Sequence, residues 1–425
     1  MTYLRQDIMA NLRCFSSHPE RKSEMRYPCK AGFWRKSTSA LGAIFLGILI
    51  LSGCTTPTAP LSVDNVFSPC QTAHQVGFIR TSHKELIDAS GCQVHLSGVN
   101  WFGFETSAFA PHGLWARNWK DMLKQMAHLG FNSIRLPYTN QLFDPASKPT
   151  AINYWLNPDL KGLQGLALMD RIIQGAGSLG LKVILDRHDP TTDLRPALWY
   201  TDQMPQSRWI ADWVMLAQHY RGNETVIGAD LANEPHGPAT WGDGNASTDW
   251  RLAAEQAGNA VLAANPDWLI IVEGIEQYHG DFYWQGGNLT GAAQYPVRLS
   301  VQDKLVYSAH DYGPEVYPQS WFQAANFPHN LSAVWQKHWA YLQNVGNTPV
   351  FVGEFGGRSM GQDTEGVWQR SLLAFLKAND ISYAYWAWNP DSGDTGGILK
   401  DDWKTVNQSK LDVLNAYQWP ALGQP

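Results

Sequence analysis

Short runs of hydrophobic residues alternate with amphipathic stretches along most of the chain. Eight runs have the length and the β-branched and aromatic content of buried strands, at residues 94–101, 133–138, 182–188, 226–234, 268–273, 305–310, 349–354 and 383–388. Six stretches between them carry apolar residues at helical spacing, at residues 119–129, 166–179, 209–220, 250–264, 333–344 and 366–377. Residues 276–298 are polar, aromatic and glycine-rich, which predicts a long functional loop.

Strands that alternate with helices predict an α/β protein with a parallel sheet. Eight such units within about 330 residues suit a closed (β/α)8 TIM barrel. The rival fold, an open doubly wound sheet, would place a phosphate-binding G-x-G-x-x-G turn after the first strand, and residues 98–103 lack that pattern. We therefore expect one barrel domain over residues 77–425, which begins with a short hairpin within residues 78–88.

Two of the predicted strands lead directly into a glutamate. The run at 226–230 leads into Asn233-Glu234-Pro235, where the proline cannot continue the strand, and the run at 349–352 leads into Glu354. In a barrel of parallel strands the carboxyl ends face the active site. Two carboxylates that meet there are what the cleavage of a glycosidic bond requires.

Other polar motifs at the strand ends make the pattern more specific. With Asn-Glu-Pro at 233–235, the His-x-Tyr at 310–312 and the Gly-Glu-Phe-Gly at 353–356, the chain resembles the glycoside hydrolase family 5 cellulases. The opening stretch 98–106 and the loop 389–399 match the same family, and the resemblance extends from about residue 77 to residue 419. It implies a TIM barrel and hydrolysis with retention of configuration.

The resemblance also implies a role for each matched residue. Glu354 would be the nucleophile, and Glu234 would be the general acid that later acts as the base. Arg135 would hold Glu354 ionised by a charge-assisted hydrogen bond, and Tyr312 would donate to the same carboxylate.

The remaining matched residues would bind the sugar. Asn233 would bind the 2-hydroxyl, His188 and His310 would bind hydroxyl groups or orient the carboxylates, and Trp388 would stack under the sugar at the cleavage site. A satisfied core histidine is the alternative for His188. Trp386 lies two residues before Trp388 and would share its face, but we leave it outside the site because core packing explains it as well.

The stretch after the first predicted strand contains two further candidates, His112 and Trp115. A histidine and a tryptophan near the mouth of a barrel suit contact with a sugar. Neither lies within a matched motif.

Composition narrows the function further. The chain has 16% charged residues and a net charge of −6, so nothing basic indicates a nucleic acid partner. The 20 tryptophans either fill a large core or line a groove for sugar rings. There is no H-E-x-x-H motif or Cys/His ligand set, so we expect no metal and no cofactor, and we expect a monomer.

The N-terminal region has the features of a signal peptide. A basic flank precedes the apolar run 40–50, which is too short to span a bilayer. The run leads into Leu51-Ser52-Gly53-Cys54, which resembles the lipobox of bacterial lipoproteins. We expect a signal peptide at 1–53, starting at Met1 or Met25, a lipid on Cys54, and a tether at 54–76. Thr55 favours the outer membrane, and secretion or a periplasmic location is the alternative.

Two of the other cysteines, Cys70 and Cys92, remain in the mature chain and predict a disulfide in an oxidising compartment, with two free thiols as the alternative. Together these features predict a lipid-anchored, retaining endo-β-1,4-glucanase that acts on cellulose or β-glucan. The alternatives are the same chemistry on mannan or xyloglucan, and a sugar-binding surface lipoprotein without catalysis.

Overall fold

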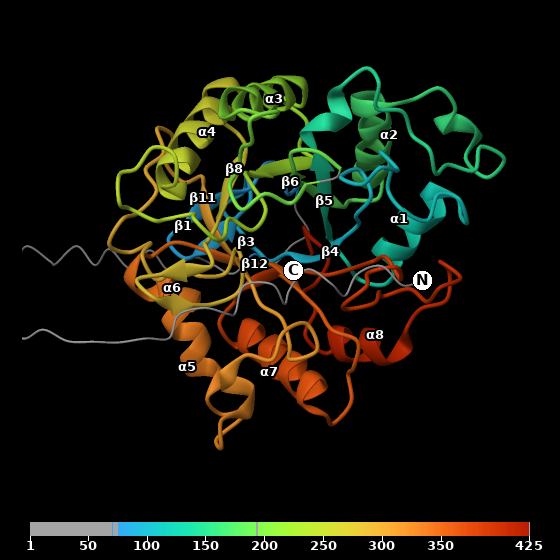
Figure 1. The fold of residues 1–425 in the computed structure, drawn as a ribbon. Helices are drawn as coiled ribbons and strands as arrows, with labels where there is room; N and C mark the ends of the chain where they lie inside the picture. Colours follow the sequence, from blue (N-terminus) through green and yellow to red (C-terminus); the bar gives the residue numbers. More distant parts are fainter. Residues whose placement is uncertain (1–69, 71–74, 193, 425) are drawn as a thin grey trace, which may run out of the picture. The chain divides into compact units, whose positions relative to one another are not determined.

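A computed structural model describes residues 70, 75–192 and 194–424 (Figure 1). Eight parallel strands close into a barrel, in which β13 pairs with β4. The strands are β4 (Ser97–Asn100), β5 (Ser133–Thr139), β6 (Lys182–Asp189), β7 (Val226–Asp230), β8 (Leu269–Glu273), β11 (Leu305–His310), β12 (Val350–Phe355) and β13 (Ser382–Tyr385). Each overlaps one predicted strand, so the predicted (β/α)8 barrel is confirmed.

Helices surround the barrel on its outside (Figure 1). They are α1 (Trp119–His128), α2 (Gly165–Ser178), α3 (Gln206–His219), α4 (Trp250–Ala264), α5 (Leu331–Trp335), α6 (Leu342–Val345), α7 (Thr364–Ala378) and α8 (Gln408–Asn415). Three begin where sequence rules place a capping residue, because the side chains of Asn118, Asp249 and Asp363 accept hydrogen bonds from the first turns of α1, α4 and α7.

Two helical regions differ from the prediction. The helix expected at 333–344 is divided into α5, a π-helical turn (Gln336–Ala340) and α6. Helix α8 was not predicted, since its eight residues carry only a weak apolar stripe. Short 3-10 turns lie at Asn140–Phe143, Pro158–Leu160 and Ser320–Gln323.

A small antiparallel sheet closes the amino-terminal end of the barrel. Strands β1 (Arg80–Ser82) and β2 (Glu85–Ile87) form the predicted hairpin, and β3 (Gln93–Val94) adds a third strand. Apolar side chains of this sheet, such as Leu86 and Val94, belong to the same buried cluster as the barrel residues Ile184 and Phe351. A disulfide joins Cys70 to Cys92, which lies between β2 and β3.

Tryptophans fill much of the layer between the strands and the helices, and most of those described are buried. Two of them also fix the end of β7, because the indole nitrogens of Trp209 and Trp213 donate to the carbonyl of Leu231 at 2.8 and 3.0 Å. The chain therefore leaves β7 in a defined direction, immediately before Asn233 and Glu234.

The loop at 276–298 contains the two-stranded hairpin formed by β9 (Gln277–Tyr278) and β10 (Asp281–Phe282). Within the described part of the chain, no helix is both long enough and apolar enough to cross a membrane. The apolar run at 40–50 lies outside the described residues.

Candidate active site

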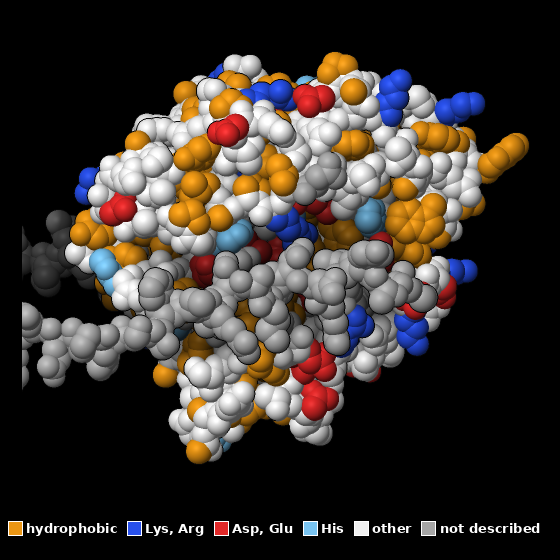
Figure 2. Space-filling view, viewed as in Figure 1, with side chains coloured by type: hydrophobic (Ala, Val, Ile, Leu, Met, Phe, Trp, Pro, Cys, Tyr) orange, Lys and Arg blue, Asp and Glu red, His pale blue; other side chains and the backbone are white. Residues whose placement is uncertain are grey.

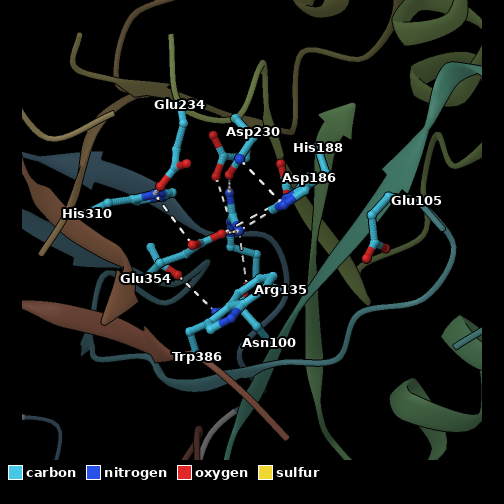
Figure 3. Close-up of polar contacts among 12 residues, drawn as sticks. Asn100, Glu105, Arg135, Asp186, His188, Asp230, Glu234, His310, Glu354 and Trp386 are labelled. Atoms are coloured by element: carbon cyan, nitrogen blue, oxygen red, sulfur yellow. Dashed lines mark hydrogen bonds and ion pairs between the residues drawn. The ribbon is translucent and has the colours of Figure 1, made fainter. Parts of the chain in front are cut away.

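A buried arginine, Arg135, lies at the centre of the barrel mouth. The Arg135 guanidinium from β5 contacts four carboxylates from four other strands. Figure 3 labels three of them, Asp186, Asp230 and Glu354. The nitrogen–oxygen distances are 3.0 Å to Asp186, 2.8 Å to Asp230, 3.0 Å to Glu273 and 2.6 Å to Glu354. Because a buried charge is costly unless it is paired, this cluster fixes the relative positions of the strand ends.

Glu354 is buried at the end of β12 and is held by both of its oxygens. Arg135 donates to Oε1, and the Tyr312 hydroxyl donates to Oε2 at 2.6 Å. The Nδ1 atom of His310 lies 3.6 Å from Oε2. Glu354 is therefore oriented from three sides.

The surroundings of Glu354 also set its charge. Burial alone would raise its pKa, but nearby positive charges outweigh this effect and hold the pKa well below its ordinary value. They belong to His310, Arg135 and His188, and the Tyr312 hydrogen bond acts in the same direction. Glu354 is thus an ionised carboxylate at neutral pH.

Glu234 is held differently, beyond the end of β7. Its backbone has φ of +50°, a conformation that is uncommon outside glycine and that clusters at functional sites. Its amide donates to Glu273 Oε2 at 2.7 Å, and its Oε1 lies 2.9 Å from His310 Nδ1. The side chain is 21% exposed, so it is open to a ligand.

The two glutamates meet in a cleft of about 670 Å³. One carboxylate oxygen of Glu234 lies within 4.8 Å of one of Glu354. Figure 2 shows charged and histidine side chains that gather with hydrophobic ones in a hollow of the face that it presents. Retaining glycosidases separate their carboxyl groups by about 5 to 5.5 Å, and inverting ones by about 6.5 to 9.5 Å, so this spacing suits direct attack on a sugar.

The site also brings in His188 and Asn233. His188 lines the cleft, with Nδ1 at 2.7 Å from Asp186 Oδ2 and 4.0 Å from Glu354 Oε1. Asn233 accepts a hydrogen bond from Arg135 at 3.0 Å, and its amide nitrogen lies 3.5 Å from His188. Seven residues predicted from the motifs therefore lie together, namely Arg135, His188, Asn233, Glu234, His310, Tyr312 and Glu354.

Three overlapping trios of the site place one donor atom each within 4.8 Å of the others, a spacing that a metal ion could bridge. They are Asp186 with His188 and Glu354, Glu234 with His310 and Glu354, and Asp186 with Asp230 and Glu273. Each trio contains at least one carboxylate that Arg135 already binds. Since a guanidinium supplies the positive charge there, we assign no metal site.

Comparisons with known proteins agree with this geometry. Residues 87–392 match the family model "Cellulase (glycosyl hydrolase family 5)". The chain belongs to glycosyl hydrolase family 5. An endoglucanase of Paenibacillus polymyxa is 52% identical over 350 residues, which cover 81% of this chain and 88% of that protein. The major extracellular endoglucanase of Xanthomonas campestris is 44% identical, over 80% of this chain and 71% of its own length.

A solved structure is also similar. The endocellulase of Pyrococcus horikoshii, in a complex with cellotetraose, matches with a TM-score of 0.76 and 42% identity, over 82% of this chain and all of that chain. The predicted membership of family 5 is therefore confirmed.

For one residue of this family 5 chain, Trp388, the prediction of a place in the site was wrong. Trp388 is completely buried (0% exposed), so it cannot stack under a sugar, and Trp386 lines the cleft instead. The Trp386 ring lies parallel to those of Phe102 and His188, with centroids 5.4 and 5.5 Å away. The prediction was wrong because β13 ends at Tyr385, so the two-residue alternation does not continue to 388.

His112 and Trp115 are not among the described residues that line the cleft. His112 joins two loops, because its ring nitrogens lie 2.9 Å from Thr106 Oγ1 and 2.9 Å from Asp391 Oδ2. Trp115 is 39% exposed and packs edge-on against His112 and Trp403. Contact of either residue with substrate stays a prediction.

The sequence interpretation missed several residues of the site. Asp230 and Glu273 are the last residues of β7 and β8, and Asp186 follows the apolar residues 183–185 within β6. An acidic residue after an apolar run is the same signal that identified Glu354. The loop predicted to be functional supplies Phe282 and Trp284 to the cleft wall. Aromatic residues within a glycine-rich loop could have indicated them, but not which rings face the cleft.

The charge of His188 leads to a prediction about stability. Burial alone would lower its pKa, but Asp186 and Asp189 outweigh this effect and raise the pKa from 6.5 to about 9. A pKa raised by folding adds stability that is complete below pH 6.5 and is lost as pH rises to about 9. His188→Gln should therefore lose less unfolding free energy than the wild type between pH 6.5 and 9.

Urea unfolding at the two pH values measures this difference. His128→Gln, in the last turn of α1, serves as the control and should follow the wild type. Equal pH dependence in His188→Gln and the wild type would contradict the assignment of charge.

Proposed function

We propose that the chain is a retaining endo-β-1,4-glucanase that hydrolyses cellulose or soluble β-glucan by double displacement. The observation that carries the proposal is the pair of glutamates in the cleft, which have oxygens within 4.8 Å of each other. Glu354, ionised and held by Arg135 and Tyr312, suits the nucleophile. Glu234, partly exposed and beside His310, suits the acid/base.

In the first step, a Glu354 oxygen attacks the anomeric carbon, and the bond from that carbon to the leaving glucose oxygen breaks. Glu234 gives its proton to that oxygen, so the leaving sugar departs as an alcohol. In the second step, Glu234 takes a proton from water as the water oxygen attacks the anomeric carbon. Glu354 is released as a carboxylate, and one water has been consumed per bond cleaved.

Other side chains of the cleft support these steps. Asn233, which accepts a hydrogen bond from Arg135, would bind the 2-hydroxyl of the sugar bound to Glu354. His188, which lines the cleft, would bind a neighbouring hydroxyl. Trp386 offers a flat face for the sugar ring, whose C–H groups pack well against an aromatic surface.

The names of the relatives support a glucan as substrate and cutting within the chain. The Paenibacillus and Xanthomonas proteins are both endoglucanases, and the Pyrococcus endocellulase was solved with cellotetraose. A mannosidase of Aspergillus niger is only 22% identical, so mannan is less favoured as the substrate. The complete pair of glutamates speaks against a binder without catalysis.

We further propose that the enzyme is exported and anchored by lipid. Export is supported by the Cys70–Cys92 disulfide and by the extracellular Xanthomonas relative. The anchor rests on sequence alone, because the signal peptide at 1–53 and Cys54 lie outside the described residues.

Lipidation of Cys54 can be tested in bacterial cells. Labelled palmitate should be incorporated into the wild type and not into Cys54→Ala, because only this thiol follows the predicted cleavage site. Equal labelling of both proteins, or of neither, would exclude an anchor at Cys54.

The roles of the two glutamates can be tested by substitution and azide rescue. Glu234→Ala and Glu354→Ala should each reduce hydrolysis of cellotetraose by roughly 100-fold or more. With 2,4-dinitrophenyl β-cellobioside and azide, Glu354→Ala should form the α-glycosyl azide, because azide takes the place of the nucleophile. Glu234→Ala should form the β-glycosyl azide, because azide then attacks the glycosyl-enzyme from the other side.

Glu255→Ala on α4 is the control and should keep wild-type activity. Wild type that hydrolyses manno- or xylogluco-oligosaccharides but not cellotetraose would change the proposed substrate, and no activity on any of them would favour a binder. Interchanged azide products would reverse the two roles.

The corrected tryptophan assignment gives a paired prediction. Trp386→Ala should lower kcat/KM on cellotetraose by about 10-fold, the worth of one aromatic contact, with little change in stability. Trp388→Ala should lower the free energy of unfolding by about 3 to 5 kcal/mol through the cavity it leaves. Steady-state kinetics and urea unfolding of both variants check this prediction. If Trp388→Ala lost activity without losing stability, and Trp386→Ala lost stability instead, Trp388 would be the residue that contacts the sugar.

A further inference from the structure

Glu273 has no part in the double displacement described above, yet it lies behind the acid/base. It ends β8, is fully buried, and is not among the described residues that line the cleft. Its main-chain carbonyl accepts a hydrogen bond from the Trp250 indole at 2.8 Å, which fixes the end of the strand. A buried carboxylate is costly, so its contacts indicate what holds it there.

One Glu273 oxygen holds the backbone of the acid/base. Oε2 accepts the Glu234 amide at 2.7 Å, at the residue with φ of +50°. Gly286 closes over the same place, and a Cβ there would overlap Glu273 Oε2 and approach Glu234 Cα to 3.2 Å. The turn that presents Glu234 is therefore held by a charge-assisted hydrogen bond to Glu273, and Gly286 packs directly against it.

The other Glu273 oxygen faces the group that contacts the Glu234 side chain. Oε1 lies 3.3 Å from His310 Nε2 and 3.0 Å from an Arg135 nitrogen. The other ring nitrogen of His310 lies 2.9 Å from Glu234 Oε1 (Figure 3). Glu273 thus reaches Glu234 by two routes, directly at the amide and through His310 at the carboxyl group.

The contact through His310 matters because the protonation state of a histidine decides which of its ring nitrogens donate and which accept. A neutral imidazole has one donor and one acceptor nitrogen, whereas an imidazolium has two donors and no acceptor. An imidazolium at His310 can only donate to Glu234 Oε1 and cannot take the proton of Glu234. That proton must then reside on Oε2, the oxygen that His310 does not hold.

We propose that Glu273 is a positioning residue for the acid/base, fixing the Glu234 turn and keeping His310 a donor, so that the Glu234 proton stays on Oε2 for the leaving group. This inference rests on the proposed function. Glu273 touches neither the substrate nor the reacting atoms, and it acts through Glu234 and His310.

The surrounding charges agree with this role. Burial alone would lower the pKa of His310, but Glu273 and Glu354 outweigh this effect and raise it well above its ordinary value. The titratable or charged groups that act on His310 or Glu273 from the packed elements are Arg135, Asp186, Asp230, Glu234 and Glu354.

Asp230 is the carboxyl group that competes with Glu273 for a proton. Burial raises the pKa of both, and that of Asp230 most strongly. Glu273 accepts hydrogen bonds from the Glu234 amide and from Arg135, and it also lies 3.3 Å from His310 Nε2. Among the described residues, Asp230 accepts only from Arg135 Nε, and its Oδ1 has no hydrogen-bond partner. A shared proton therefore resides on Asp230 and leaves Glu273 charged.

Glu273→Gln tests the inference, because the amide offers one acceptor oxygen where the carboxylate offers two. Either the Glu234 amide or the His310–Arg135 pair then loses its acceptor. We expect kcat/KM on cellotetraose to fall about 100-fold, within the range for loss of general acid catalysis. With 2,4-dinitrophenyl β-cellobioside, whose leaving group needs no proton, the fall should be no more than about threefold.

The pH profile is a second readout, which a merely structural role would not move. Without the negative charge of Glu273, His310 loses its proton at lower pH, so the alkaline limb of kcat/KM on cellotetraose should move to lower pH. Asp249→Asn is the matched control. Asp249 is as completely buried, but it accepts from the backbone amides of Gly242 and Gly244 in the preceding loop and of Leu252 in the first turn of α4. Activity on both substrates and the pH profile of this variant should therefore follow the wild type.

The possible failures are distinguishable. Equal losses on both substrates, or an unmoved alkaline limb, would give Glu273 a purely structural role and overturn the inference. Unchanged activity on cellotetraose would overturn it as well. If the wild type hydrolyses neither substrate, the proposed function itself fails.

Discussion

The site depends on the pairing of one buried guanidinium with carboxylates from four strands. Arg135 reaches Asp186, Asp230, Glu273 and Glu354 within 3.0 Å, so each of these buried carboxyl groups has a positively charged partner in the barrel interior. Loss of one partner from such a cluster leaves an uncompensated buried charge, which is strongly destabilising. The same contacts that hold the strand ends together therefore also fix the position and the charge of Glu354.

Two glutamates of the same chemistry differ here because their surroundings differ. Glu354 is buried among cations and hydrogen-bond donors, which favour its charged form. Glu234 lies at a strained turn, partly exposed, and touches His310, whose proton is retained by neighbouring carboxylates. An acid/base that must both give and take a proton needs this access, whereas a nucleophile needs a fixed orientation.

Much of the site could be predicted from the sequence, since barrel geometry brings all strand ends to one mouth. Glu354 follows an apolar run, and Arg135 lies within its strand. Two-residue alternation along the strand is enough to predict which way such side chains point. The same logic misassigned Trp388, because β13 ends at Tyr385 and the chain beyond it follows loop geometry. Glu273 carried the same signal as Glu354 and was missed, because no motif set it apart.

The sequence by itself determined the eight strands, most of the helices and the two candidate glutamates, because side-chain periodicity is a local property of the chain. Only the tertiary structure decided which strand-end carboxylate meets which cation, which tryptophan faces the cleft, and which glutamate stays exposed. These depend on distances between residues far apart in the chain and on how much water each group keeps. Spacing along the sequence encodes neither quantity.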